Sequence, residues 1–212
     1  SKYLSGPPAA REKGRDTTHF SVIDGDGNRV AATLSINYPF GSGFVAGDTG
    51  VVLNDEMDDF VAKPGVPNAY GLVGGEANAI APGKRPLSSM SPTFVEGPDR
   101  TLVVGTPGGS RIITMVARAA IGMIWDEGGA DAVNHWVTRP RLHHQYRPDK
   151  VQHEPGGLGP ELRAALAERG HTFKDVGRQF GDMHAILWDR ESDSVKTAAD
   201  PRGLGEGAVV SP

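Results

Sequence analysis

A short apolar strand leads directly into a helix between residues 101 and 124. The segment TLVVGT carries no charge, and the turn Pro107-Gly108-Gly109 separates it from RIITMVARAAIGMI. In the second segment apolar residues recur at helical spacing, at positions 112, 113, 116, 120, 123 and 124. Ser110 is a favourable N-cap residue for such a helix. The two segments therefore predict a strand that is followed at once by a helix.

The other predicted elements do not alternate regularly around this pair. HFSVI, the GDGN turn and RVAATLSI indicate a β-hairpin, and GFVAGDTGVVLND indicates a second pair of strands. ADAVNHWV and PELRAALAERG, which closes at Gly170, indicate two short helices. TFKDV, MHAILWD and SVKTAAD indicate late strands. Strands, then helices, then strands favour an α+β fold over repeated βαβ units.

Two stretches lack the periodicity of helices and strands. Residues 63–92 are rich in Gly and Pro and predict a long ordered loop, and loops of that length in compact domains tend to be functional. Residues 1–16 (SKYLSGPPAAREKGRD) are polar, with Pro7-Pro8 and a charged run, and predict a linker. We therefore expect a linker over residues 1–16 and one folded unit over residues 17–212.

The composition removes several function classes. A net charge of −4 without a block of like charge does not favour nucleic acid or a membrane surface as a partner. The absence of Cys excludes disulfides, thiolate metal sites and a Cys nucleophile. No apolar run approaches the roughly 18 residues of a membrane span. The chain opens with Ser and has no basic-then-apolar leader, so we expect a processed product or a fragment.

Three motif-like segments fail on spacing. DGDGN at residues 24–28 begins like a calcium loop, but Arg29 and Ser35 stand where that loop needs Gly and Glu, which favours a hairpin turn. The glycines of residues 41–47 have the wrong spacing for a dinucleotide loop. His143 and His144 are adjacent and lack a Cys or His partner at ligand spacing, which favours packing or surface roles over a metal site.

Three other regions combine hydroxyls, carboxylates and paired glycines: DTTH at residues 16–19, NDEMDD at 54–59, and PLSSMSP at 86–92 with TPGGSR at 106–111. TTHFSV, LNDEMDDF, KPGVPNAYGLVGG, KRPLSSMSPT, TPGGSRII, RPRLHHQ and ADPR follow one another in an order that resembles the small subunit of γ-glutamyltransferases (γ-glutamyltranspeptidases). These enzymes are N-terminal nucleophile hydrolases, and the resemblance runs through nearly all of residues 17–212.

The resemblance implies a four-layer αββα sandwich made by cutting a precursor between Asp16 and Thr17. Residues 1–16 would be the tail of the large subunit and 17–212 the catalytic small subunit, so the partner would be the large subunit of the same precursor. It also implies a periplasmic or secreted enzyme and chemistry without a metal or cofactor.

Thr17 would be the nucleophile. A threonine hydroxyl needs a nearby base, and cleavage before Thr17 frees an α-amine with an ordinary pKa of about 7.7–8.0. Ser35 falls where the family usually has a Thr that supports the nucleophile, and Gly108 and Gly109 resemble its oxyanion hole. From the residues alone, Thr17 and Ser35 also suit strand ends, and the glycines also suit a strand–helix turn.

The resemblance also assigns a donor site. Asn37, Glu56 and Asp59 would hold the α-amino group of a γ-glutamyl donor, and its α-carboxylate would bind the serines Ser88 and Ser89. Tyr70 would be a lid residue, with a buried loop aromatic as the other interpretation. Solvated acids and turn serines are the corresponding alternatives for the other positions.

The implied reaction is two-step acyl transfer from glutathione or a related γ-glutamyl amide to water, an amino acid or a dipeptide. A large-subunit Arg would complete the donor site. One alternative is a glutaryl or cephalosporin acylase of the same fold, which Asp59 disfavours because a glutaryl group has no ammonium. Another is an inactive relative that acts as a binding module, which the intact Thr17, Gly108 and Gly109 disfavour.

Overall fold

The computed structural model describes residues 17–68, 71–125 and 129–210, and it begins with a β-hairpin. Strand β1 (Thr17–Ile23) pairs antiparallel with β2 (Arg29–Ser35), in a register that places Thr17 opposite Ser35. The Asp24 carboxylate accepts hydrogen bonds from the backbone N–H groups of Asp26 and Asn28, at 3.0 and 2.8 Å. DGDGN is therefore the hairpin turn that its spacing favours.

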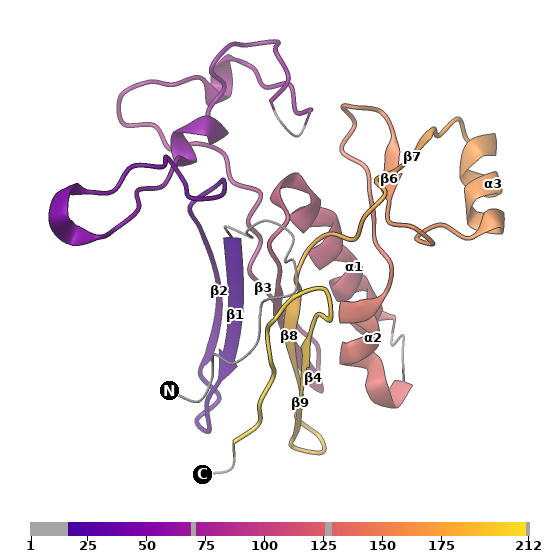
Figure 1. Ribbon diagram of the computed structural model, residues 1–212. Coiled ribbons are helices and arrows are strands. Elements are labelled where there is room, and N and C mark those ends of the chain that lie inside the picture. Colours follow the sequence, from indigo (N-terminus) through magenta and orange to yellow (C-terminus); the bar gives the residue numbers. More distant parts are fainter. Residues whose placement is uncertain (1–16, 69–70, 126–128, 211–212) are drawn as a thin grey trace, which may run out of the picture.

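A four-stranded antiparallel sheet packs against the hairpin. Its order is β3 (Thr93–Glu96), β4 (Arg100–Gly105), β8 (His184–Asp189) and β9 (Ser194–Ala199). Helices α1 (Ile112–Ile124) and α2 (Ala132–Thr138) lie on the face of this sheet that is turned away from the hairpin (Figure 1). The described residues thus form three layers, namely hairpin, sheet and helices, and they do not include the second helical layer of an αββα sandwich.

The hydrophobic core lies between the four-stranded sheet and the two helices. Leu102 and Val104 of β4 belong to it, whereas Val103, which is also fully buried, points to the opposite face by strand alternation. Gly122 of α1 lets the helices approach closely, because a Cβ there would stand 2.6 Å from Trp136 Cδ1. The main contributors from the sheet and helices are Leu102, Val104, Ala185, Leu187, Ile112, Met115, Val116, Ala119, Met123, Val133, Trp136 and Val137.

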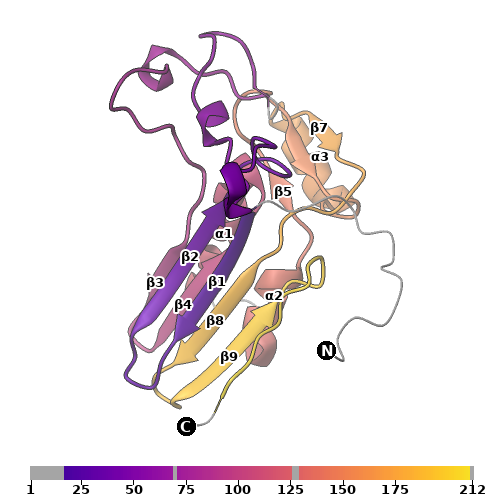
Figure 2. The same cartoon turned by 60° about the vertical axis from the view of Figure 1, so that its left-hand side comes forward.

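A smaller unit stands beside this core at one end of the sheets (Figures 1 and 2). It contains β5 (Leu142–His143), β6 (Val151–His153) and β7 (Phe173–Asp175), in the order β5-β6-β7. Helix α3 (Pro160–Glu168) lies in the connection between the parallel strands β6 and β7. The irregular chain of residues 36–92 rises from the same end of the sheets (Figure 2).

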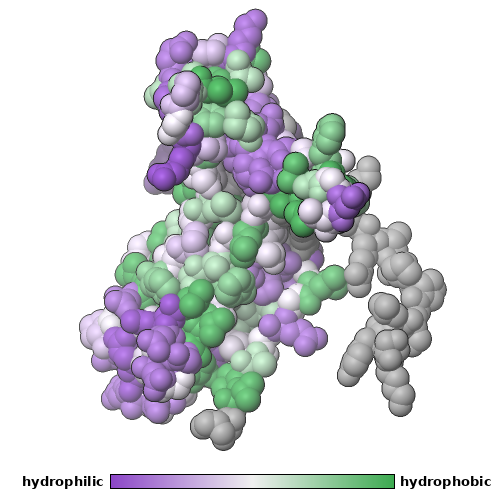
Figure 3. Space-filling model, turned by 90° about the vertical axis from the view of Figure 1, so that its left-hand side faces the viewer, coloured by the Kyte–Doolittle hydropathy of each residue, from purple (hydrophilic) through white to green (hydrophobic). Residues whose placement is uncertain are grey.

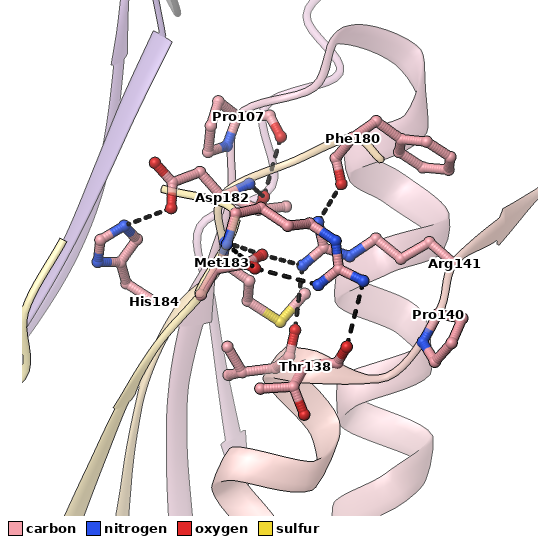
Figure 4. A network of polar contacts seen from close by, with 12 residues as sticks. Pro107, Thr138, Pro140, Arg141, Phe180, Asp182, Met183 and His184 are labelled. Carbon is pink, nitrogen blue, oxygen red and sulfur yellow. Dashed lines mark hydrogen bonds and ion pairs between the residues drawn. The ribbon is translucent and has the colours of Figure 1, made fainter. Parts of the chain in front are cut away.

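Buried ion pairs join the smaller unit to the core. Arg202 donates to Glu154 Oε2 at 2.8 Å and to Asp200 Oδ1 at 3.0 Å, and Arg141 pairs with the other oxygen of Asp200. Arg141 also donates to the carbonyl oxygens of Val137 and Phe180, so its charge is surrounded by acceptors (Figure 4). Because each buried charge has an opposite charge and further hydrogen bonds, the network avoids the large cost of an isolated buried ion.

Most sequence-based predictions of elements are confirmed, and two are wrong. Residues 43–55 do not form a strand pair, because the only pairing there is an isolated bridge between Val45 and Val52 around the 3-10 turn Gly47–Thr49. Ser110 is not an N-cap, since it lies inside the 3-10 turn Gly109–Arg111 and its hydroxyl donates to Gln145.

The remaining short helices are 3-10 turns at Glu56–Asp59, Glu76–Asn78 and Gly129–Asp131. The turn at Glu76–Asn78 lies within residues 63–92, whose described residues otherwise form a loop with isolated bridges at Pro67, Val73 and Ala79. Within the described ranges, no helix combines the length and the hydrophobicity that crossing a membrane requires. Strands β3, β5 and β6 were not predicted from the sequence.

Candidate active site

Thr17 and Ser35 face each other across the end of the hairpin. Their Oγ1 and Oγ atoms lie 2.8 Å apart, within hydrogen-bonding distance. Ser35 Oγ also accepts the backbone N–H of Asn37 at 2.9 Å. The Thr17 hydroxyl is therefore held by a partner that is itself fixed by the backbone, and the predicted nucleophile and its predicted support are brought together.

One pocket collects most of the predicted site residues. It receives Thr17 and Ser35 from the hairpin, Gly109 from the turn before α1, and five of the predicted residues from the irregular segment between β2 and β3. The predicted residues that line it are Thr17, Ser35, Asn37, Glu56, Asp59, Ser88, Ser89 and Gly109. Gly108 is not among the described residues of the lining, and Tyr70 lies outside the described residues.

The 3-10 turn Glu56–Asp59 places two carboxylates in this pocket. Burial, and after it the negative charge of Glu56, raises the pKa of the Asp59 carboxyl to about 6. Oε1 of Glu56 is buried and accepts no hydrogen bond from any residue that the structure describes. Two partly desolvated acids that lack a cation among the described residues make a favourable place for a positively charged group.

Asn37 connects the end of β2 to the acidic turn. Its backbone lies in the left-handed region at φ 71°, which Asn tolerates better than most residues, and its Nδ2 donates to the Asp55 carbonyl oxygen at 3.3 Å. The next backbone N–H, that of Tyr38, donates to Asp55 Oδ1 at 3.1 Å. Asp55, which precedes the acidic turn, is therefore held by Asn37 and Tyr38, which follow β2.

The glycine turn lies between β4 and α1 and has a backbone that favours glycine. Gly108 has φ 146° and Gly109 has φ 60°, both in the region that side chains disfavour. Within the described residues, neither N–H group donates a hydrogen bond to the protein. The turn therefore offers two uncommitted backbone donors next to the pocket that contains Thr17.

Sequence reasoning missed a buried histidine on β1, two residues after Thr17. His19 Nδ1 lies 2.8 Å from Thr33 Oγ1, and its Nε2 lies 3.0 Å from Ser21 Oγ. Burial, with a smaller effect of the nearby His184, lowers the pKa of His19 to about 4, so its ring is neutral at physiological pH. The alternation of β1 could have indicated this position, because residues 17, 19 and 21 share the inward face.

The pocket lining also contains residues that were not predicted. Four come from the long loop, one from the 3-10 turn before α1, and one is the first residue of α1: Asn68, Leu72, Leu87, Met90, Ser110 and Ile112. Loop residues of this kind carry no periodic signal, so only the folded structure shows which of them reach the pocket.

β1 begins at a hydroxyl residue, Thr17, which faces the hydroxyl of Ser35 across the hairpin, and the hairpin packs on a four-stranded sheet. This arrangement is that of the N-terminal nucleophile fold class. A family described as Gamma-glutamyltranspeptidase matches residues 2–210. The chain belongs to this family.

Individual relatives agree with this assignment. The chain is 47% identical over 199 residues to a glutathione hydrolase proenzyme of Pseudomonas aeruginosa, which covers 92% of this chain and 35% of the relative. It therefore spans about a third of the length of that relative. The γ-glutamyltranspeptidase of Pseudomonas nitroreducens complexed with L-DON superposes with a TM-score of 0.80 at 44% identity, over 92% of this chain and 100% of the solved chain.

A more distant structural match shows the fold alone. The cephalosporin acylase of Bacillus halodurans superposes with a TM-score of 0.65 at 22% identity, over 90% of this chain and 34% of that chain.

Proposed function

We propose that this chain is the catalytic part of an enzyme that transfers the γ-glutamyl group of glutathione or a related γ-glutamyl amide. The observation that carries the proposal is the single pocket in which Thr17 meets Glu56, Asp59, Ser88, Ser89 and Gly109. Each part of the pocket suits one group of a γ-glutamyl donor. The acids suit its ammonium, the serines suit its α-carboxylate, and the Thr17 hydroxyl with the glycine turn suits the amide that is cleaved. Membership of the family supports the same reaction.

The acids suit the α-ammonium group of the donor. An ammonium beside Asp59 would compensate the charge that burial and Glu56 now disfavour, and it would give Glu56 Oε1 the hydrogen-bond donor that it lacks among the described residues. Asn37 lines the same pocket and would contribute its side-chain amide. The ammonium is therefore the part of the donor that this site distinguishes most strongly.

The serines suit the α-carboxylate. Ser88 Oγ accepts the Met90 N–H at 3.2 Å, which leaves its own hydroxyl proton to donate to a ligand. Ser89 lines the pocket next to it. An Arg of the large subunit would complete the carboxylate site with a bidentate pair.

The reaction would proceed through an acyl-enzyme. Thr17 Oγ1 attacks the γ-carbonyl carbon while its proton passes to the free α-amine of Thr17, and the N–H groups of Gly108 and Gly109 stabilise the oxyanion. The C–N bond then breaks, and the amine leaves with that proton. Water, an amino acid or a dipeptide attacks the ester and restores the Thr17 hydroxyl. Ser35 keeps the nucleophile oriented through the 2.8 Å contact.

The α-amine would arise from self-cleavage between Asp16 and Thr17, a junction that lies partly outside the described residues. Thr17 Oγ1 would attack the Asp16 carbonyl carbon, and an N→O shift would give an ester that water hydrolyses. Residues 1–16 would then be the end of the large subunit, and residues 17–212 the small subunit.

The outer face of the hairpin supports the need for a large subunit. Phe20, Val22, Val30 and Leu34 point away from the four-stranded sheet and are each about half exposed, between 45% and 52%. Figure 3 shows hydrophobic side chains gathered over the middle of this side of the molecule. A protein rarely leaves such a face in water, so we propose that the rest of the precursor covers it. By its resemblance to the family, we further propose that the enzyme is periplasmic or secreted.

A glutaryl or cephalosporin acylase fits the pocket less well. A glutaryl donor has hydrogen in place of the ammonium, and it would bury Glu56 and Asp59 without a partner. A binding module without activity fits less well too, because the Thr17 and Ser35 hydroxyls lie 2.8 Å apart in the pocket that Gly109 lines.

The decisive measurement compares two donors with the same leaving group. The full-length protein should cleave a γ-glutamyl anilide at least about 100-fold more efficiently than the matching glutaryl anilide, because only the first donor carries the ammonium. A preference for the glutaryl donor would establish the acylase alternative. Loss of both activities in a correctly cleaved protein would establish the binding module.

A further inference from the structure

A chain of buried and partly buried side chains ties the turn before α1 to strand β5 and the residues that follow it. Ser110 Oγ donates to Gln145 Oε1 at 2.7 Å, and His143 Nε2 lies 2.7 Å from the same oxygen. On the other side of the ring, His143 Nδ1 lies 2.8 Å from Thr114 Oγ1. Ser110 and Thr114 are one helical turn apart, so residues 143–145 hold the beginning of α1 at two points.

The orientation of these groups follows from their partners. Gln145 Nε2 donates to the Arg147 carbonyl oxygen at 3.0 Å, which turns Oε1 toward Ser110 and His143. His143 Nε2 must then carry a proton, and Nδ1 faces the Thr114 hydroxyl, whose one proton is shared between Nδ1 and the Arg111 carbonyl oxygen at 3.1 Å. Burial lowers the pKa of His143, which keeps the ring neutral and this arrangement intact at physiological pH.

The turn that Gln145 reaches has little stiffness of its own. Gly108 and Gly109 both have positive φ angles, and glycine pays no steric penalty for moving away from them. Ser110 is the first residue after them with a side chain, and it is only 7% exposed. The direction in which the two glycine N–H groups point therefore depends on how Ser110 is held.

We propose that Gln145 is a positioning residue that orients the Gly108-Gly109 N–H groups toward the acyl group, acting through Ser110. The inference rests on the proposed γ-glutamyl transfer and goes beyond it, because Gln145 is not among the described residues that line the pocket. A second tie runs beside it, since Arg111 Nη2 donates to Gln152 Oε1 at 2.7 Å. That tie keeps α1 attached to β6 when the Gln145 tie is removed, so the effect should fall on the turn and not on the fold.

The test is a double-mutant cycle in the full-length protein. Ser110→Ala removes the donor, and Gln145→Met removes the acceptor while keeping the length of the side chain. Each variant should lower kcat for a γ-glutamyl anilide by about 10-fold and should change KM by less than about twofold. The value of kcat is calculated per cleaved molecule, and intact mass gives the fraction of molecules that is cleaved. The double variant should lose no more than Gln145→Met alone, because that variant already lacks the hydrogen bond that Ser110→Ala removes.

Ser192→Ala is the matched control. It also removes one serine hydroxyl that bonds side chains, with 2.9 Å contacts to Asp189 Oδ1 and Ser194 Oγ, but it lies on the exposed β8–β9 turn, so kcat should not change. Thermal melting should show all variants folded.

Three results would overturn the inference. One is an unchanged kcat in Gln145→Met, the second is a loss confined to KM, and the third is a double variant whose losses multiply. An inactive but cleaved wild type would overturn the proposed function, and this inference with it. An active wild type with unaffected variants would overturn the role of Gln145 alone.

Discussion

The ring of His19 lies directly against Gly105. A Cβ added at Gly105 would stand 2.3 Å from both Cε1 and Nδ1 of the imidazole, far inside contact distance. His19 is two residues beyond Thr17 on β1, and Gly105 is the last residue of β4, three residues before the glycine turn. This contact therefore sets the distance between the strand of the nucleophile and the strand that leads to the predicted oxyanion hole.

Gly105→Ala should disturb that distance. Overpacking of a filled core typically costs about 1–3 kcal/mol, and the ring cannot turn aside without losing its bonds to Thr33 and Ser21. We expect a lower melting temperature and a lower kcat. Gly97→Ala, in the turn between β3 and β4, is the control, because its Cβ would meet its nearest neighbours at an ordinary 3.6 Å. Equal melting temperatures for the two variants would show that the contact is not tight.

Thr17→Ala should leave the precursor uncut, because no hydroxyl remains to attack the Asp16 carbonyl. Thr17→Ser should still cut, since it keeps the hydroxyl that faces Ser35 at 2.8 Å. Intact-mass spectrometry of the expressed full-length protein distinguishes the two results. Normal maturation of the alanine variant would remove Thr17 from the mechanism.

Gly109→Val should lower kcat more than it raises KM, because a side chain at this position forces the turn away from φ 60° and crowds the pocket. Loss of one oxyanion donor costs about 3 kcal/mol in known hydrolases, or roughly a hundredfold in rate. Gly170→Val is the matched control, with a positive φ of 88° but open space around it, at the end of α3. Steady-state kinetics on a γ-glutamyl anilide should separate the two variants, and similar kcat losses in both would assign the effect to backbone strain.

Asp59→Asn should reduce kcat/KM for a γ-glutamyl anilide by about two orders of magnitude, because the ammonium loses its charged partner. Activity on the glutaryl anilide should hold steady or rise, since no carboxylate is then buried against an apolar part of the donor. Equal losses on both donors would mean that Asp59 supports the fold and does not recognise the ammonium.

The same variant should stabilise the free enzyme at neutral pH. The folded-state pKa of Asp59, about 6, is above its ordinary value, so the folded protein favours the protonated carboxyl. The stability linked to this proton is fully present below about pH 4 and is lost as the pH rises through 6. Asp59→Asn should therefore melt at a higher temperature than the wild type at pH 7.5, and the difference should shrink toward pH 4. A difference that does not vary with pH would contradict the pKa shift.

The contact between Thr17 and Ser35 could be anticipated from the sequence. A hairpin whose turn is DGDGN pairs residues that lie equally far from position 26, and Thr17 and Ser35 are each nine residues from it. The pocket could not be derived in this way. Its acids and serines lie on a segment without periodicity, where local physics does not decide which residues meet, and only the family resemblance indicated them. The error at Ser110 has a physical reason, because its hydroxyl binds Gln145, 35 residues away, and a distant partner leaves no signal in the local sequence.

The hairpin register bears on how the proposed cleavage of the precursor precedes the reaction with substrate. Seven residue pairs hold β1 to β2, from Thr17 with Ser35 at one end to Ile23 with Arg29 at the other. Cutting the peptide bond before Thr17 breaks none of these pairs, so the new amino terminus stays where the backbone was. In the proposed mechanism the Thr17 hydroxyl would therefore attack its own chain first and a diffusing amide afterwards from the same position, and the cut would need no rearrangement of β1.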